Sequence, residues 1–271
     1  QNTANKNYLE ACHFKNDFKS GESIAEYFEK NKVVLENLSS DTWFIGSQAE
    51  LNLKKKIEEK GIPLKNWDVK IYRGILTGLN EAFIINQETY DKLVAQDPKS
   101  KEILKPILRG RDIQRYGYKW PKLWLINSHN GYINKAGKKI PPVDINNYPI
   151  IKQYLDQFGE KLKKRDDQGI TSYNLRNCAY IEEFEKEKVV YQEIVREPSF
   201  TYDNQSFYCE ATTFLMTGNN IKYLLAILNS KAGSFFFREF YAGGGLGEYG
   251  YRYKKAFLEK MPIPKIILQN Q

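Results

Sequence analysis

The stretch VKIYRGILTGLNEAFII, residues 69–85, indicates how this chain folds. It begins with the β-rich run Val69–Tyr72 and ends with a second apolar run, Ala82–Ile85, so we expect two short strands. Gly74 and Gly78 lie in the connection between the strands, and glycine permits backbone conformations that other residues resist. The stretch therefore predicts a glycine-dependent loop held between two strands.

Helices and strands follow one another irregularly on both sides of this stretch. Upstream, Ser47 and Glu50 form a capping box and Gly61 follows, which predicts a helix over residues 47–60. Downstream, the patterns predict helices that begin after Asn86, at Pro149 and after Asn219 or Asn220, and the helix from Pro149 ends in the basic run Lys161–Arg165. They also predict a short helix over Lys254–Lys260, strands over Lys122–Asn127 and Lys188–Val195, and a hairpin formed by Ser199–Tyr202 and Ser206–Glu210. Because no regular βαβ alternation is present, we expect an α+β fold rather than a doubly wound sheet.

The charge balance and the scarcity of cysteine narrow the class of protein. The 271 residues include 41 Lys and Arg against 33 Asp and Glu, and the net charge of +8 favours polyanionic partners. Three cysteines and two histidines at wide spacing suit neither a disulfide framework nor a zinc site. No apolar run approaches the length of a membrane span, and the N-terminal region lacks a signal-type apolar segment. We therefore expect a cytoplasmic protein with no membrane partner.

The first forty residues differ from the rest of the chain. Ile24, Phe28, Leu35 and Leu38 recur among charged residues at near-helical spacing. We expect residues 1–40 to form a helical linker and residues 41–271 to form the folded domain. The sequence begins at Gln1 rather than at methionine, so we also expect the chain to be part of a longer protein.

Signatures of catalysis are weak. The glycine-rich run over residues 243–250 lacks the lysine-containing pattern of a phosphate-binding loop, and it serves either as a structural segment or as a ligand contact. Glu58 and Glu59 belong to a charged helix face, where solvated carboxylates are the simpler interpretation. Asp112, Asp166 and Asp167 have basic neighbours but no carboxylate partner at a defined spacing. We expect no catalytic residues and no metal ligands.

Basic and aromatic residues alternate in three places, which we treat as candidates for nucleic-acid contact. The groups are Lys105, Arg109, Arg111, Arg115 and Tyr116; then Tyr173, Asn174 and Arg176; then Tyr249, Arg252 and Lys254. Arginine can hold phosphates or read guanine, and asparagine can read adenine. The alternative is internal ion pairing, for example with Asp112, and for Tyr173 a place in the core.

Three stretches in order resemble one known family. They are YRGILTGLNEAF (72–83), ILKPILRGRDI (103–113), and YLLAILNS (223–230) followed by Pro262-Ile263-Pro264; residues 172–180 and 184–190 are similar as well. Together these stretches, from about Trp43 to Pro264, resemble the TaqI-like C-terminal specificity domain. This is the target recognition domain of fused type II restriction-modification enzymes with an N6-adenine methyltransferase.

The resemblance implies a mixed β-sheet body framed by helices, similar to the recognition domains of type I specificity subunits. It implies three further DNA-binding candidates, Arg73, Thr77 and Asn80, and three structural turn glycines, Gly74, Gly78 and Gly110. The family's catalytic (Asp/Asn/Ser)-Pro-Pro-aromatic motif is missing, because the only Pro-Pro pair lies in KIPPV, residues 139–143. This departure implies a binding module without chemistry of its own.

The expected function is sequence-specific recognition of double-stranded DNA as one module of a restriction-modification enzyme. Such a module positions DNA for a separate, upstream N6-adenine methyltransferase or endonuclease domain. We expect no cofactor in this chain, and S-adenosylmethionine and Mg²⁺ in the parent enzyme. The alternatives are half of a type I restriction specificity subunit, or a fragment of a metal-dependent nuclease. The resemblance does not imply a particular recognition sequence, because base-reading residues vary widely among such domains.

Overall fold

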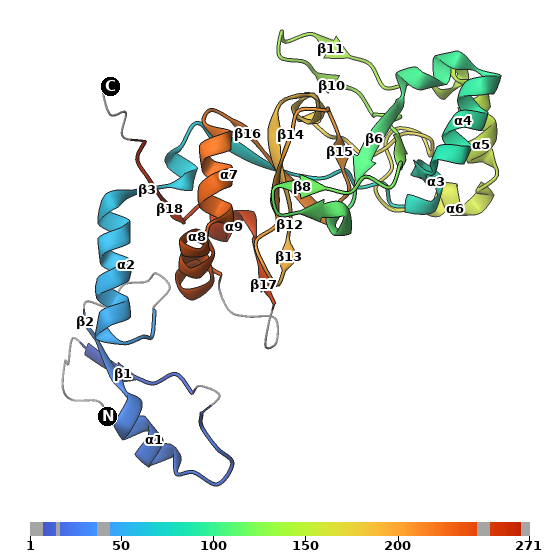
Figure 1. The fold of residues 1–271 in the computed structure, drawn as a ribbon. Helices are drawn as coiled ribbons and strands as arrows, with labels where there is room; N and C mark the ends of the chain where they lie inside the picture. Colours follow the sequence, from blue (N-terminus) through green and yellow to red (C-terminus); the bar gives the residue numbers. More distant parts are fainter. Residues whose placement is uncertain (1–7, 15–16, 37–43, 243–249, 267–271) are drawn as a thin grey trace. The chain divides into compact units, whose positions relative to one another are not determined.

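The computed structural model describes residues 8–14, 17–36, 44–242 and 250–266 (Figure 1). Contacts divide the chain into two compact units, Gln1–Pro63 with Pro262–Gln271, and Leu64–Met261. The sequence patterns suggest a boundary near residue 40, whereas the division in the structure follows Pro63. Among the described residues, no helix is both long and apolar enough to span a membrane.

The described residues of the smaller unit form two antiparallel strand pairs and two helices. Its elements are β1 (Tyr8–Ala11) paired with β2 (Val33–Glu36), α1 (Ile24–Asn31), α2 (Gln48–Lys60), and β3 (Gly61–Pro63) paired with β18 (Pro262–Pro264). The helix predicted over residues 47–60 is confirmed: the Ser47 hydroxyl accepts the Glu50 N–H, and the Glu50 carboxylate accepts the Ser47 N–H. The helical prediction for residues 1–40 needs correction, because Leu35 lies in β2, where the β-branched pair before it favours strand pairing.

The main sheet of the larger unit has four antiparallel strands in the order β14-β12-β16-β4. These strands are β4 (Val69–Arg73), β12 (Lys188–Gln192), β14 (Phe200–Asp203) and β16 (Thr213–Gly218). Val189, Val190 and Tyr191 of the central strand β12 are completely buried, as expected for a run of β-favouring residues covered on both faces. The strands predicted at Val69–Tyr72 and in Lys188–Val195 are confirmed.

A second, mixed sheet has the order β15-β6-β9-β5, in which β15 runs parallel to β6. Its strands are β5 (Ile84–Ile85), β6 (Leu104–Leu108), β9 (Trp124–Ile126) and β15 (Tyr208–Cys209). The predicted hairpin of residues 199–210 is wrong, because β14 pairs with β12 while β15 pairs with β6. The cause is Asp203: its buried carboxylate lies 2.5 Å from the Lys188 ammonium and accepts the Phe207 N–H, so the chain turns out of the first sheet.

Short strand pairs and helices complete the larger unit. The pairs are β7 (Ile113–Gln114) with β8 (Gly117–Tyr118), β10 (Tyr132–Ile133) with β11 (Lys139–Ile140), and β13 (Ile194–Val195) with β17 (Tyr251–Arg252). The helices are α3 (Asn80–Phe83), α4 (Gln87–Gln96), α5 (Pro149–Asp156), α6 (Gly159–Lys164), α7 (Ile221–Asn229), α8 (Lys231–Phe236) and α9 (Lys255–Leu258), with single turns η1 (Leu64–Asn66), η2 (Pro98–Glu102), η3 (Gly110–Asp112), η4 (Ile145–Asn147), η5 (Ile181–Glu185) and the π-type η6 (Phe237–Tyr241). Figure 1 shows α4, α5 and α6 gathered beyond the second sheet and α7 beside the first.

Two of the local predictions differ from these elements. The run Ala82–Ile85 is predicted as one strand, but its first two residues end helix α3 and only Ile84 and Ile85 form a strand. The helix follows a turn in which the Thr77 hydroxyl accepts the Leu79 N–H. The helix predicted from Pro149 is split into α5 and α6, because Gly159 adopts a φ of +48°. The α+β class is confirmed, and the core is continuous from the second sheet to α5 and α6.

Candidate nucleic-acid interface

The segment Arg73–Asn80 leaves the main sheet at the end of β4 and forms one wall of the candidate site. Gly74 runs so close to neighbouring backbone that a Cβ there would lie 2.1 Å from the Glu210 carbonyl oxygen. Gly78 has a φ of +66°, and a Cβ there would lie 1.9 Å from the Asp166 carbonyl oxygen. Both glycines therefore let this segment pack directly against distant parts of the chain.

The polar side chains of this segment make hydrogen bonds within the protein that stabilise its conformation. Thr77 is buried, and its hydroxyl donates to Asn80 Oδ1 at 2.6 Å. Asn80 Nδ2 donates in turn to Glu210 Oε1, although Asn80 is exposed. Arg73 is also exposed, with its Nε donating to the Ala211 carbonyl at 3.0 Å. The Thr77 hydroxyl is therefore enclosed, while Arg73 and Asn80 lie at the surface, and DNA contact by these residues stays a prediction.

A buried arginine joins this segment to the other wall of the site. The Arg165 guanidinium donates to the carbonyls of Thr77 at 2.7 Å, Asp167 at 2.8 Å, Ser172 at 3.2 Å, and also Asn174. Burial lowers the pKa of this guanidinium, and the nearby Asp167 carboxylate acts in the opposite direction. The basic run Lys161–Arg165 is therefore not entirely solvent-exposed, because its last residue, Arg165, is buried and bonded within the protein.

The second wall is the segment that follows this arginine. Asn174 is buried, and its Nδ2 donates to the Val143 carbonyl at 2.9 Å, so its amide has an internal partner and its DNA contact stays a prediction. Tyr173 is half-buried and packs against the core. Arg176 is exposed and forms an ion pair with Asp167, with 2.6 Å between the guanidinium nitrogen and the carboxylate oxygen. Only Arg176 of this group is fully at the surface.

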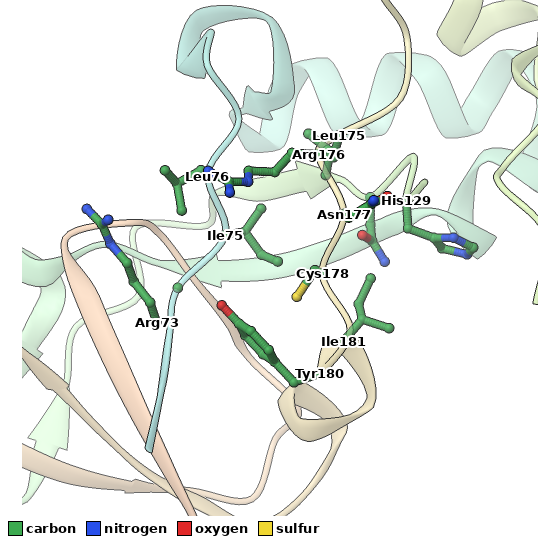
Figure 2. Close-up of a pocket in the computed structure, with 12 residues that line it drawn as sticks. Arg73, Ile75, Leu76, His129, Leu175, Arg176, Asn177, Cys178, Tyr180 and Ile181 are labelled. Carbon is green, nitrogen blue, oxygen red and sulfur yellow. The ribbon is translucent and has the colours of Figure 1, made fainter. Parts of the chain in front are cut away.

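A cavity of about 240 Å³ lies between the two walls (Figure 2). Its twelve lining residues are Arg73, Gly74, Ile75, Leu76, Asn127, His129, Leu175, Arg176, Asn177, Cys178, Tyr180 and Ile181. Figure 2 shows Arg176 extending towards the segment 73–76, with the Cys178 sulfur and the Tyr180 hydroxyl turned to the same side. None of the lining residues in this described part of the chain is acidic, so its surface is apolar or neutral apart from two arginines.

The thiol, the phenol and the imidazole of the cavity are neutral near pH 7. Burial raises the pKa of the Cys178 thiol to about 11 and that of the Tyr180 phenol to about 12, so both keep their protons. Burial, together with the positive charge of Lys105, lowers the pKa of His129. His129 Nδ1 accepts the Gly131 N–H at 3.2 Å, which places the proton of the neutral ring on Nε2. These groups are hydrogen-bonding partners rather than nucleophiles.

The arginine-rich segment around Gly110 divides into internal and exposed members. The Arg109 guanidinium makes two 3.0 Å hydrogen bonds to the carboxylate of buried Asp112, so the alternative of internal ion pairing holds for Arg109. Arg111 is exposed and makes no ion pair or hydrogen bond with its side chain among the described residues. Gly110 lies in the turn as expected of a structural turn glycine, without a positive φ, and a Cβ there would lie 3.1 Å from Thr212 Oγ1.

The remaining candidates are also unequally free. Lys105 lies 3.6 Å from Glu185, and the Arg115 guanidinium donates to the Asn229 carbonyl and lies over the ring of the exposed Tyr116. Arg252 is 3.8 Å from Glu193, whereas Lys254 is exposed. Tyr249 and the glycine-rich run before it lie outside the described residues. Surface access is therefore clearest for Arg111, Tyr116 and Lys254.

The fold brings together two candidates that are far apart in the sequence, Arg73 and Arg176, at one cavity. Sequence reasoning missed Asn127, Cys178 and Tyr180 as members of this site, although the last two lie in a stretch that resembles the family. It also treated Arg165 only as the end of a basic run. Among the described residues, no group of three or more His, Cys, Asp or Glu side chains could hold a metal ion.

An α+β body that places two arginines from separate segments at a non-acidic hollow defines a domain suited to binding polyanions. The chain belongs to the TaqI-like C-terminal specificity domain family, whose model matches residues 105–263. This finding confirms the resemblance drawn from the sequence and supports a role in DNA recognition. No curated protein matches the sequence.

Two solved restriction-modification proteins share the fold. The type IIL enzyme MmeI, solved in complex with DNA, superimposes with a TM-score of 0.52 at 12% identity, covering 73% of this chain and 25% of that one. The type IIG restriction endonuclease BpuSI has a TM-score of 0.51 at 17% identity, covering 79% of this chain and 26% of that one. The present chain thus spans about a quarter of the length of these structures.

Proposed function

We propose that this chain is the sequence-specific DNA recognition module of a restriction-modification enzyme, and that it positions double-stranded DNA for a separate N6-adenine methyltransferase or endonuclease domain. The observation that carries the proposal is the family match over residues 105–263. The exposed arginines support it, since guanidinium groups both hold phosphates and read guanine in the major groove.

The proposed DNA contacts differ in how many of their hydrogen-bond donors are already used within the protein. Arg111 has a side chain that makes no ion pair with the described residues, so its guanidinium is available for a phosphate or a base. Arg73 and Arg176 use some of their donors within the protein and have further N–H groups for DNA. Lys105, Arg115, Tyr116, Asn80, Arg252 and Lys254 complete the proposed DNA-binding set.

The parent enzyme is part of the same proposal. Residues 1–40 would link the recognition module, residues 41–271, to the upstream domains. S-adenosylmethionine and Mg²⁺ would serve those domains, because the described residues contain neither the family's catalytic motif nor a cluster of metal-ligating side chains. This chain's own contribution is therefore to bind the duplex and hold it in register.

Selection from a random duplex library tests the proposal. The chain is incubated with the duplexes at low salt, bound DNA is recovered and sequenced, and the affinity for the enriched site is compared with that for a shuffled site. We expect a site preferred by at least about a thousandfold, since specific affinities exceed non-specific ones by factors of this order. Radiolabelled S-adenosylmethionine serves as the control, and no methyl group should be transferred by this chain alone.

The proposal fails if no site is enriched, or if the shuffled duplex binds as tightly as the enriched one. Methyl transfer by the isolated chain would contradict the division of labour between recognition and catalysis. The variant Arg111→Ala provides an internal check, because removing an exposed contact should weaken DNA binding without lowering the melting temperature.

A further inference from the structure

The cavity beside Arg73 and Arg176 has the size and lining of a site for one planar ring. A cavity of about 150 Å³ is known to hold a benzene ring, so a volume of about 240 Å³ has room for a larger heterocycle. Ile75 and Leu76 line one side, and Leu175 lines the wall that carries Arg176 (Figure 2). Apolar side chains on two segments are the surroundings in which proteins hold an unstacked base.

The polar groups of the lining suit an uncharged ring that carries hydrogen-bonding edges. The Cys178 thiol and the Tyr180 hydroxyl are both protonated, and each can donate and accept a hydrogen bond. Asn127 also lines the cavity, and its buried Oδ1 has no hydrogen-bond partner among the described residues. Its orientation follows from Tyr208, whose hydroxyl donates to Glu185 at 2.9 Å and must therefore accept from Asn127 Nδ2.

The charged groups of the lining suit a phosphate. Arg176 has an exposed side chain, and only one of its nitrogens bonds to Asp167 among the described residues. Within the described part of the chain, Arg73 likewise bonds only through its Nε, to the Ala211 carbonyl. An arginine has five N–H donors in a planar fork, so both side chains have donors left for phosphate oxygens. The cavity therefore combines a neutral lining, which suits an uncharged base, with two arginines, which suit the phosphate attached to that base.

We propose that this cavity is a nucleotide-binding subsite, which takes one base between the segments 73–76 and 175–178 and its phosphate on Arg73 and Arg176. The inference rests on the proposed DNA-binding function and specifies that the cavity binds a single nucleotide. The nucleotide is either one that has left the stack of a bound duplex or a free mononucleotide. Both have the same chemistry, and the experiment distinguishes them.

The test compares fully paired duplexes with duplexes that carry one unpaired nucleotide. Four fluorescein-labelled duplexes, each with a different unpaired base, and their paired parents are titrated with the chain, and the anisotropy is measured. An unpaired base needs little energy to leave the stack, so we expect at least one such duplex to bind about tenfold more tightly than its parent. The mononucleotides dAMP, dGMP, dCMP and dTMP are titrated calorimetrically in parallel.

Two pairs of matched variants locate the effect. Asn177→Trp fills the cavity from an exposed lining position, and Asn204→Trp is its control, because each asparagine is exposed and accepts one side-chain hydrogen bond. Arg176→Ala removes a proposed phosphate contact, and Arg238→Ala is its control, because both arginines have side chains 52% exposed and paired with a carboxylate. We expect Asn177→Trp and Arg176→Ala to abolish the preference for the unpaired nucleotide, while both controls keep it.

The outcomes separate this inference from the proposed function. Equal binding of all eight duplexes without mononucleotide binding overturns the subsite and leaves DNA recognition standing. A preference that survives Asn177→Trp also overturns it. Absence of duplex binding overturns the proposed function, and in that case mononucleotide binding that Asn177→Trp removes still supports the subsite. Preference for unpaired duplexes without mononucleotide binding identifies the ligand as an unstacked nucleotide of bound DNA.

Discussion

Arg165 makes hydrogen bonds to five backbone carbonyls, and these carbonyls belong to both walls of the candidate site. A buried carbonyl that loses its partner keeps the full penalty of desolvation. The guanidinium also lies over the ring of buried Phe83, with 4.5 Å between its carbon and the ring centre. This one side chain therefore determines how the segments around residues 77 and 174 meet.

Replacement of Arg165 should be far more damaging than replacement of the neighbouring surface arginine. We expect Arg165→Ala to lower the free energy of unfolding by about 3 kcal/mol or more, because several buried carbonyls lose their donors. Arg176→Ala should lower it by less than about 1 kcal/mol, since an exposed ion pair contributes little. Urea denaturation followed by circular dichroism measures both, and similar losses in the two variants would contradict the structural role of Arg165.

His129 should make stability depend on pH in a mildly acidic range. Burial and the charge of Lys105 lower its pKa in the folded state, so below its ordinary pKa of about 6.5 the unfolded chain binds more protons. The folded state should therefore lose stability as the pH falls from about 6.5 to 5.5, and be unaffected above this range. The measurement is the melting temperature of wild type and His129→Gln at both pH values; the variant should show a smaller decrease, and an equal decrease would refute the assignment.

At the scale of elements, the turn η3 follows one internally paired arginine and carries one exposed arginine. Arg109 is held by the Asp112 carboxylate and stabilises the turn, whereas Arg111 projects from the same turn without a partner among the described residues. Gly110 between them is buried and packs close to Gln192 on β12 and to Thr212. The turn η3 therefore packs against the main sheet and exposes the side chain of Arg111, while Arg109 is bonded internally.

Single alanine variants should separate these two roles. We expect Arg109→Ala to lower the melting temperature, because it leaves the buried Asp112 carboxylate without its cation. Arg111→Ala should keep the melting temperature, weaken DNA binding and flatten the dependence of log K on log salt by about one unit if it contacts phosphate. If Arg111 reads guanine instead, the loss should be about 1–3 kcal/mol and confined to sequences with that base. Unchanged affinity and salt dependence for Arg111→Ala would exclude it from the interface.

For the whole molecule, the net charge of +8 should be visible in the salt dependence of DNA binding. If the domain neutralises about six phosphates, log K should fall against log salt with a slope of about −5, at about 0.9 per phosphate. Fluorescence anisotropy at a series of NaCl concentrations measures this slope on a duplex of fixed sequence. Binding that does not respond to salt, or no binding at low salt, would rule out the electrostatic basis of the interface.

Local sequence patterns predicted the elements whose stabilising contacts are close in the chain. Helix α2 begins at the Ser47 and Glu50 capping box, and α4 begins where Asn86 accepts the Thr89 N–H, contacts that span three residues. The hairpin prediction failed because the partner of Asp203 is Lys188 on another strand. A pattern of β-favouring residues shows that a strand forms, but not which strand it pairs with.

The sequence by itself determined the α+β class, the net positive charge, the capped helices and, through its ordered motifs, the family. Only the tertiary structure decided which basic residues are free, because exposure of a guanidinium depends on partners distant in sequence, as for Arg165 with Thr77 and for Arg73 with Ala211. The cavity likewise exists only after folding. Its walls come from three separate segments of the chain, and hydrogen bonds and close glycine contacts between distant residues bring them together.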